Sequence, residues 1–260
     1  MADRPSHRLD LSKTFDVIVG KEPDQKRFTV FHGVLTQRSK FFRVVRSERW
    51  DANPGKPTKL EHVNAKMFSA YLYCVNFGPG SLASLVLSMQ EKHPLYLRQL
   101  NRTSGSSGRG CDPFNVIGPD YIYDGSDEPV EMFLVDLYLL ATLLLDPITA
   151  NMAADELVGV ADKRREYHSA VLVHHVYIHT LVGSPLRELI VDHYLDGRNH
   201  TNLAEYLKFG VFPPDFIKDL LLKVLTFDDQ YAGHILRNMY RVREVGGHEY
   251  HQPLLKQEQE

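Results

Sequence analysis

Residues 28–42 read FTVFHGVLTQRSKFF, and this stretch decides the fold because strand chemistry changes to helix chemistry at one histidine, His32. The aromatic and β-branched residues at 28–31 suit a pleated, half-buried strand. After His32, mainly apolar side chains recur at three- and four-residue steps, and this spacing predicts two short helices. Ser39 stands where it would cap the second of them. We therefore expect a strand that turns directly into two small packing helices.

Strand and helix patterns continue on both sides of this stretch. FDVIVG at 15–20 predicts a first strand. A tight turn that contains Gly, Pro and Asp separates it from the strand at 26–31. A third strand is expected at 58–61, followed by a helix at 65–77. From Glu131 to about residue 145 a helix is apolar nearly all round and should be central, and Asp146 with Pro147 ends it and starts the next.

The order of these motifs resembles the BTB/POZ domain. In that family a strand ends at a histidine, followed by a Val-Leu pair, here Val34-Leu35, and by Ser-x-Phe-Phe, here 39–42. Segment 58–78 is similar to the family's third strand and third helix, although it has Asn76, Phe77 and Gly78 where Tyr-x-Gly is usual. Segment 135–158 is similar to the paired helices that close the domain, in the form that is common in filamentous fungi.

The resemblance implies an α+β fold of BTB/POZ type, a small three-stranded sheet packed with a helical cluster and followed by an α-helical extension. A long insertion at 79–129 interrupts the domain, and a compact domain would place it at its surface. Within it, TSGSSGRG at 103–110 has the composition of a flexible linker, 82–89 has helical spacing, and 121–123 suits a short edge strand. The expected divisions are a flexible N-terminal tail 1–13, the BTB/POZ domain 14–168, a helical C-terminal extension 169–244 and a tail 245–260.

Composition excludes several partner classes. The formal net charge is −3, with 30 basic and 33 acidic residues. The chain therefore has no positive electrostatic field that would attract nucleic acid or an anionic membrane. Residues 1–13 contain no apolar run typical of a signal peptide, and the apolar segment 132–145 is too short to cross a bilayer. Cys74 and Cys111 cannot make a disulfide framework of the secreted kind. We expect an intracellular protein, in the cytoplasm or the nucleus.

Histidines are the best candidates for chemistry in this chain. His175 and His179 are four residues apart on an expected helix, which puts both on one face, as in zinc-binding helices. No Glu lies between them in the HExxH manner, and no third ligand follows at a recognisable spacing. No nucleophile elbow or phosphate-loop motif occurs either. The expectation is a non-enzymatic chain without metal or cofactor, and the alternative is a metal-binding or catalytic protein that uses His175 and His179.

The resemblance implies that function lies in protein interaction, commonly self-association as a homodimer. In dimeric members an Asp of the first strand and a basic residue after the strand-end histidine line a charged pocket; here Asp16 matches, and Gly33 stands at the basic position. His32 is similar to the family's histidine, which has a structural role, and Leu35 lies in the first short helix. We expect these four residues and Trp50 to mark the interface.

A second role implied by the resemblance is that of an adaptor between a cullin-type ubiquitin ligase scaffold and its substrates. Ligase-binding members carry an apolar residue, then a Glu two residues later, in the loop before the third strand. Here Trp50 supplies the apolar residue, and Ala52 stands where the Glu would be. Either Trp50 is a binding hot spot or it covers the edge of the core. In the first role the insertion at 79–129 or the helical extension would choose the partner, and in the ligase role the helical extension would read the substrate.

Overall fold

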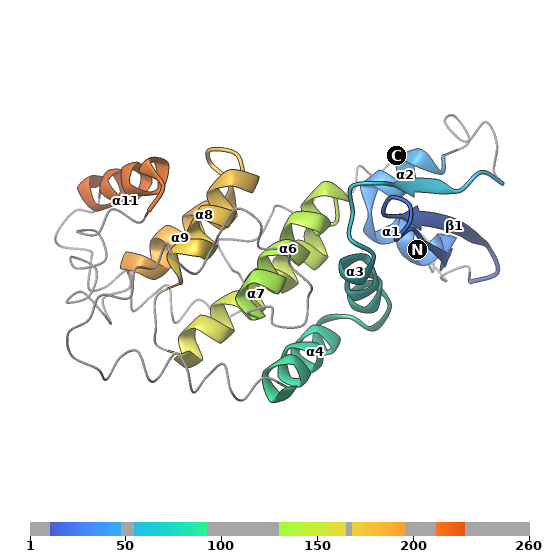
Figure 1. Ribbon diagram of the computed structural model, residues 1–260, viewed down its shortest axis with the longest axis horizontal. Coiled ribbons are helices and arrows are strands. Elements are labelled where there is room, and N and C mark those ends of the chain that lie inside the picture. The colour runs from blue at the N-terminus through green and yellow to red at the C-terminus, as the bar shows by residue number, and fades with distance from the viewer. Residues whose placement is uncertain (1–10, 48–54, 93–129, 165–167, 196–211, 227–260) are drawn as a thin grey trace, which may run out of the picture.

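The computed structural model describes residues 11–47, 55–92, 130–164, 168–195 and 212–226 (Figure 1). Over these residues the chain is α+β, with a mixed three-stranded sheet near the N-terminus followed by a helical region, and it forms nine helices in all. This confirms the expected α+β class, with a small three-stranded sheet followed by helices. The linker-like centre at 103–110 and the edge strand at 121–123 lie outside the described residues.

The sheet has β1 (Thr14–Val19) at its centre, flanked by β2 (Lys26–Phe31) and β3 (Thr58–Leu60). β1 pairs antiparallel with β2 and parallel with β3. Every second residue of β1 is buried and the residues between them are half-buried or exposed, so one face of the sheet belongs to the core. The three strands expected from the sequence are confirmed.

Two short helices follow β2, as expected from residues 28–42: α1 (His32–Arg38) and α2 (Lys40–Val45). Ser39 caps α2 by accepting a hydrogen bond from the backbone N–H of Phe42 at 3.2 Å. The backbone N–H of His32 donates to the carbonyl of Lys13 at 2.9 Å, and its ring meets the edge of Phe15 with the centroids 6.0 Å apart. His32 thus has a packed, hydrogen-bonded place at the end of the strand.

The centre of the molecule consists of α3 (Ala65–Phe77), α6 (Val130–Leu143) and α7 (Pro147–Arg164). Most residues of α6 are buried, which confirms that this nearly all-apolar helix is central. Asp146 and Pro147 separate α6 from α7 as expected, with Pro147 at the first helical position, where a missing N–H costs nothing.

The start of the insertion differs from the expectation of a surface segment. Residues 79–92 form α4 (Pro79–Lys92), which is longer than the helical spacing at 82–89 indicated. Leu82 is 0% exposed and Val86 is 3% exposed. These two side chains, four residues apart, form an apolar stripe that packs α4 against α3, α6 and α7. This part of the insertion is therefore a component of the core.

The extension contributes α8 (Ala170–His179), α9 (Pro185–Leu195) and α11 (Pro214–Thr226). Its buried residues, among them Val176, Ile190 and Phe216, belong to the same hydrophobic core as the sheet and the central helices. Buried Arg187 fixes the turn between α8 and α9, since its guanidinium donates to the carbonyl of Tyr177 at 2.8 Å and lies 4.4 Å from the centre of that ring. The extension is thus packed onto the rest of the chain.

Candidate interaction surfaces

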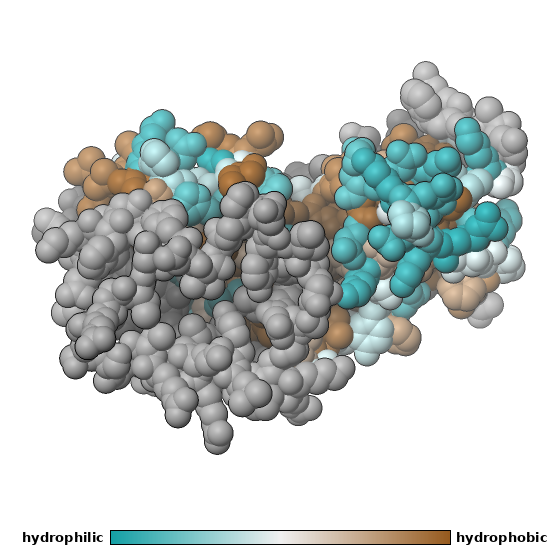
Figure 2. Space-filling model, in the orientation of Figure 1, coloured by the Kyte–Doolittle hydropathy of each residue, from teal (hydrophilic) through white to brown (hydrophobic). Residues whose placement is uncertain are grey.

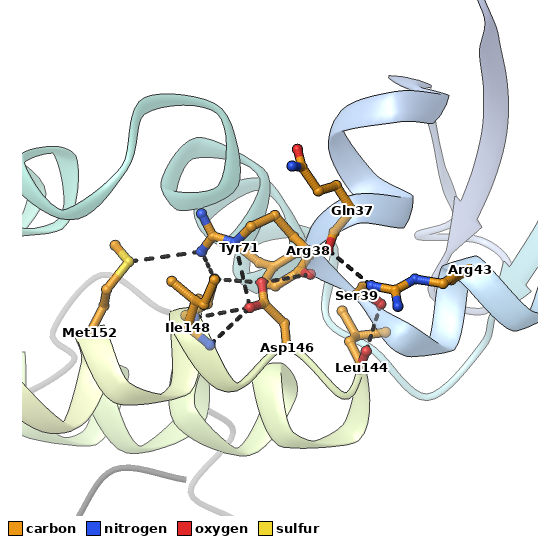
Figure 3. A network of polar contacts seen from close by, with 10 residues as sticks. Gln37, Arg38, Ser39, Arg43, Tyr71, Leu144, Asp146, Ile148 and Met152 are labelled. Atoms are coloured by element: carbon orange, nitrogen blue, oxygen red, sulfur yellow. Dashed lines mark hydrogen bonds and ion pairs between the residues drawn. The ribbon is translucent and has the colours of Figure 1, made fainter. Parts of the chain in front are cut away.

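A buried polar network joins the α1–α2 corner to the α6–α7 corner (Figure 3). Asp146 is fully buried, and its Oδ1 accepts the backbone N–H groups of Ile148 and Thr149, both at 3.1 Å, so it caps α7. Its Oδ2 accepts the hydroxyl of Thr149 at 2.7 Å and that of Tyr71 at 3.2 Å. Arg38 Nε completes the network 3.6 Å from Oδ1. These contacts hold α1, α3 and the start of α7 around one charge that follows α6.

The ends of the two corners also meet directly. The hydroxyl of Ser39 donates to the carbonyl of Leu144 at 2.5 Å, and the backbone N–H of Lys40 donates to the carbonyl of Leu145 at 3.2 Å. Leu145 has a φ of 53°, a left-handed conformation that only glycine adopts freely. This conformation lets the chain leave α6 with its carbonyls facing the N-terminus of α2, where backbone donors need partners.

Burial accounts for the ionisation of two groups in this region. Burial and the neighbouring Asp146 carboxylate raise the pKa of Tyr71 well above its ordinary value, so the phenol stays protonated and remains a donor. Burial raises the pKa of the Cys74 thiol to about 11, although a hydrogen bond with Ser81 acts in the opposite direction. The network and the nearby thiol are therefore suited to a structural role.

The residues expected at an interface do not form one exposed cluster. Asp16 lies on β1, where its carboxylate accepts the hydroxyl of Thr29 at 2.7 Å and lies 3.8 Å from Arg27, so its partners belong to β2 of the same chain. His32 and Gly33 are half-buried at the start of α1, whereas Leu35 is 1% exposed and its side chain lies in the core. Trp50 lies outside the described residues.

His175 and His179 do lie on one face of α8, as their spacing predicts, with their ring centroids 4.6 Å apart. Nε2 of His175 is 2.6 Å from Oδ1 of Asp136 on α6. Among the described residues, no group of three or more His, Cys, Asp or Glu side chains is arranged to hold a metal ion. The pair with Asp136 attaches the extension to the central helix.

An open groove of about 930 Å³ lies between α3, α4 and α6, and His179 from the end of α8 also lines it. Its most deeply buried lining residues are Phe133 and Leu140 of α6, each 6% exposed. Half-buried Met67 of α3 and Leu85 of α4 face the groove from its two other helices. The remaining apolar lining residues are Val63, Ala70, Tyr73, Met89, Leu139 and Leu143.

Charged and polar groups surround this apolar lining. The basic or imidazole-bearing lining residues are His62, Lys66 and His179, and Asp136 is the only carboxylate among the described residues that line the groove. The other polar lining residues are Asn64, Ser69, Ser84 and Ser88. The Asp136 carboxylate faces His175 with 2.6 Å between Oδ1 and Nε2, and with the histidines counted as neutral the described lining carries one positive and one negative charge.

Sequence reasoning missed this groove. The helical spacing at 82–89 indicated α4, but the groove exists only because α4 packs on α3 and α6, which are distant in sequence. One feature of α3 points to the same region: Tyr73 and Phe77 are 40% and 70% exposed, and their ring centroids are 5.0 Å apart. Two neighbouring exposed aromatic rings are typical of binding surfaces.

A second apolar surface lies over α11 and the turn between α8 and α9, where Figure 2 shows hydrophobic atoms exposed at the upper left. Leu181, Val182 and Leu225 are at least 80% exposed there. The opposite end of the view, over the sheet and α1, is mainly hydrophilic.

Of the helices in the described part of the chain, none is long and apolar enough to cross a membrane. Function is argued from the structure, because the comparisons with known proteins give no guide to it. No protein-family model matches the chain, no curated protein matches its sequence, and no solved structure matches its fold.

Proposed function

We propose that this chain is a non-enzymatic protein-interaction module of the BTB/POZ type, acting as an adaptor through the groove between α3, α4 and α6. The strand that ends directly before His32, the two short helices that follow and the paired helices α6 and α7 support the family part of this proposal. The groove supports the binding part. Its size, about 930 Å³, and its apolar lining with a polar rim suit one face of a partner segment.

One observation carries the proposal: three parts of the chain build the same groove. The domain contributes α3 and α6, the insertion contributes α4, and the extension contributes His179. Residues as far apart in the sequence as His62 and His179 therefore line a single site. This arrangement gives the insertion and the extension a direct means of choosing a partner.

A peptide-display selection tests the binding function. The full chain is immobilised and a random peptide library is selected against it, with Ala70→Arg as the groove variant, because a guanidinium at this half-buried lining position would fill the groove. We expect enriched peptides that bind the chain and lose binding in Ala70→Arg. Circular dichroism checks the folding of the variant, and Tyr73→Ala, at an exposed lining position, provides a second groove variant. Selected peptides whose binding both variants leave intact would contradict a role for the groove.

Self-association is the second part of the expectation, and it needs its own measurement. Light scattering after size exclusion, with the full chain at tens of micromolar, distinguishes a monomer from a dimer. Asp16 is bonded to Thr29 and lies near Arg27 of its own chain, and Gly33 stands at the basic position, so the charged pocket of the dimeric members is incomplete here. A monomer at these concentrations would remove homodimerisation from the proposal and leave the adaptor role.

A further inference from the structure

The charge of the chain is distributed unevenly along its sequence. The first 78 residues contain 14 basic and 8 acidic side chains, whereas the remaining 182 residues contain 16 basic and 25 acidic side chains. Residues 25–47, which include β2, α1 and α2, contain six basic side chains and no carboxylate. A positive surface at this end of the molecule attracts and orients a negatively charged partner, even though the whole chain is acidic.

Ion pairs with aspartates account for two of these six basic side chains, Arg27 and Arg38. Lys40 and Arg43 differ from them, because both are exposed and, within the described part of the chain, neither forms an ion pair. They are three residues apart in α2, a spacing that puts both on one side of the helix. This side of α2 therefore presents two positive charges to solvent.

Arg43 is held in place by acceptors that carry no net charge. Its Nε donates to the backbone carbonyl of Thr36 at 3.0 Å, and Nη2 donates to that of Gln37 at 3.1 Å, as Figure 3 shows. These bonds orient the guanidinium without cancelling its charge. They use two of the roughly five N–H donors of an arginine, and a guanidinium that is already oriented loses less conformational freedom when it binds a carboxylate.

The start of β3 adds a third exposed basic side chain beside α2. Arg46, which directly follows α2, donates from Nη2 to the carbonyl of Lys56 at 3.0 Å, and this bond places Lys56 at the end of that helix. The acidic residues Glu22, Asp24 and Glu61 belong to the opposite end of the sheet, because they follow the ends of the parallel strands β1 and β3.

We infer that a basic patch of Lys40, Arg43 and Lys56 binds the carboxylates of an acidic segment of a partner protein. Val44, which is 45% exposed beside Arg43, gives such a segment an apolar contact. None of these four described residues lines the groove between α3, α4 and α6, so the inference does not depend on the proposed use of the groove. A protein segment is favoured over nucleic acid, because the acidic remainder of the chain would repel a long polyanion.

Three labelled synthetic peptides of about 12 residues, which span at most about 40 Å, test the inference by fluorescence anisotropy with the full chain. They share the same leucines and carry glutamate, glutamine or lysine at the same flanking positions. We expect the glutamate peptide to bind at least about fivefold more tightly than the glutamine peptide, because several exposed charge contacts each contribute a small amount. The lysine peptide should bind most weakly. Raising the salt from about 50 to about 500 mM should reduce these differences, because it screens exposed charges.

Charge reversals on and off the patch provide the matched variants. Lys40→Glu and Lys56→Glu change exposed side chains, and each should weaken the glutamate peptide by about threefold or more. Lys21→Glu makes the same charge change in the turn after β1, at the opposite end of the sheet, and should leave the affinity unchanged. The groove variant Ala70→Arg should also leave it unchanged. Circular dichroism checks that each variant is folded.

Several outcomes would overturn the inference. Equal affinity for the glutamate and glutamine peptides would show that the patch has no preference for carboxylates. An equal loss in Lys21→Glu and Lys40→Glu would show that binding follows the overall charge of the chain. A DNA duplex that binds more tightly than the glutamate peptide and displaces it would identify nucleic acid as the partner. Release of the peptide by Ala70→Arg alone would place the acidic segment in the groove.

Discussion

Asp146 Oδ1 lies 3.6 Å from Arg38 Nε, in a pair whose carboxylate is fully buried and whose guanidinium side chain is 16% exposed. Replacing Asp146 by Ala removes the cap of α7 and the partner of Tyr71, and it leaves the Arg38 charge without its carboxylate. We expect Asp146→Ala to lower the free energy of unfolding by about 3 to 5 kcal/mol. Urea unfolding followed by circular dichroism measures this change.

A double-mutant cycle separates the charge pair from the helix cap. Asp146→Asn keeps an oxygen that can cap α7, so it should cost less than Asp146→Ala. Arg38→Met keeps a long apolar side chain at its place beside Met152. We expect Arg38→Met to reduce the cost of Asp146→Asn, because no unpaired guanidinium is then left in the interior. Additive costs of the two changes would mean that the ion pair contributes nothing beyond the hydrogen bonds.

Leu145→Gly should stabilise the protein. The φ of Leu145 is 53°, and a side chain in this conformation is strained, whereas glycine is not. Because Leu145 is 47% exposed, the loss of its side chain removes only part of a buried contact. We expect a gain of about 0.5 to 1 kcal/mol in the free energy of unfolding, measured by urea denaturation.

The control for Leu145→Gly is Leu143→Gly, two residues earlier. Leu143 is 60% exposed and is the last residue of α6, so it has a helical backbone in which glycine is unfavourable. We expect this control to lose up to about 1 kcal/mol. If both changes destabilise equally, the left-handed conformation at Leu145 is not a source of strain.

Cys74 should be unreactive toward thiol reagents in the folded protein. Its side chain is fully buried, and burial raises the pKa of the thiol to about 11, so at pH 8 the reactive thiolate is scarce and inaccessible. In a Cys111→Ser background, where Cys74 is the remaining cysteine, we expect an aromatic disulfide reagent to react fully only after denaturant is added. Rapid reaction of the native variant would contradict the packing of α3 against α4.

Glu156 on α7 should make the stability of the fold depend on pH. Burial raises the pKa of Glu156 above its ordinary value of 4.5, although Lys163 acts in the opposite direction. The stabilising contribution of its protonated form is complete below pH 4.5 and is lost as the pH rises through the pKa of the folded state. Glu156→Gln should therefore gain stability relative to the original chain between pH 4 and pH 7, as urea unfolding at each pH would show.

Glu61→Gln is the matched control for this pH dependence. The Glu61 side chain is exposed, so the change removes one carboxylate without altering a partly buried position. Subtracting the effect of Glu61→Gln corrects for the change in net charge. If Glu156→Gln and Glu61→Gln respond to pH alike, burial of Glu156 does not contribute to the pH dependence.

Local chemistry made the strands, the α1–α2 corner and the α6–α7 boundary predictable from the sequence. Ser39 caps α2, and Asp146 with Pro147 starts α7, through contacts within three residues along the chain. The alternating burial of β1 and the nearly all-apolar α6 follow from periodicity. Each of these signals lies within one short segment.

The network and the groove were not predictable because they depend on how distant helices pack. In the sequence, Arg38 is a charged residue within the apolar spacing after His32. No local pattern at Asp146 indicates that the two residues pair. In the same way, Leu82 and Val86 indicated a helix but not the neighbours that bury it. The groove lining combines residues from 62 to 179, so no single stretch of sequence contains its pattern.

The hydrogen bond from Ser39 to the carbonyl of Leu144 also sets an order of events during synthesis. The two residues are 105 positions apart, so the ribosome takes roughly 5 to 20 seconds to make the second after the first. Throughout that interval the nascent N-terminal corner lacks its acceptor, and the sheet lacks the helix that anchors this corner. Stable docking of the elements from β1 to α4 must therefore follow the emergence of α6.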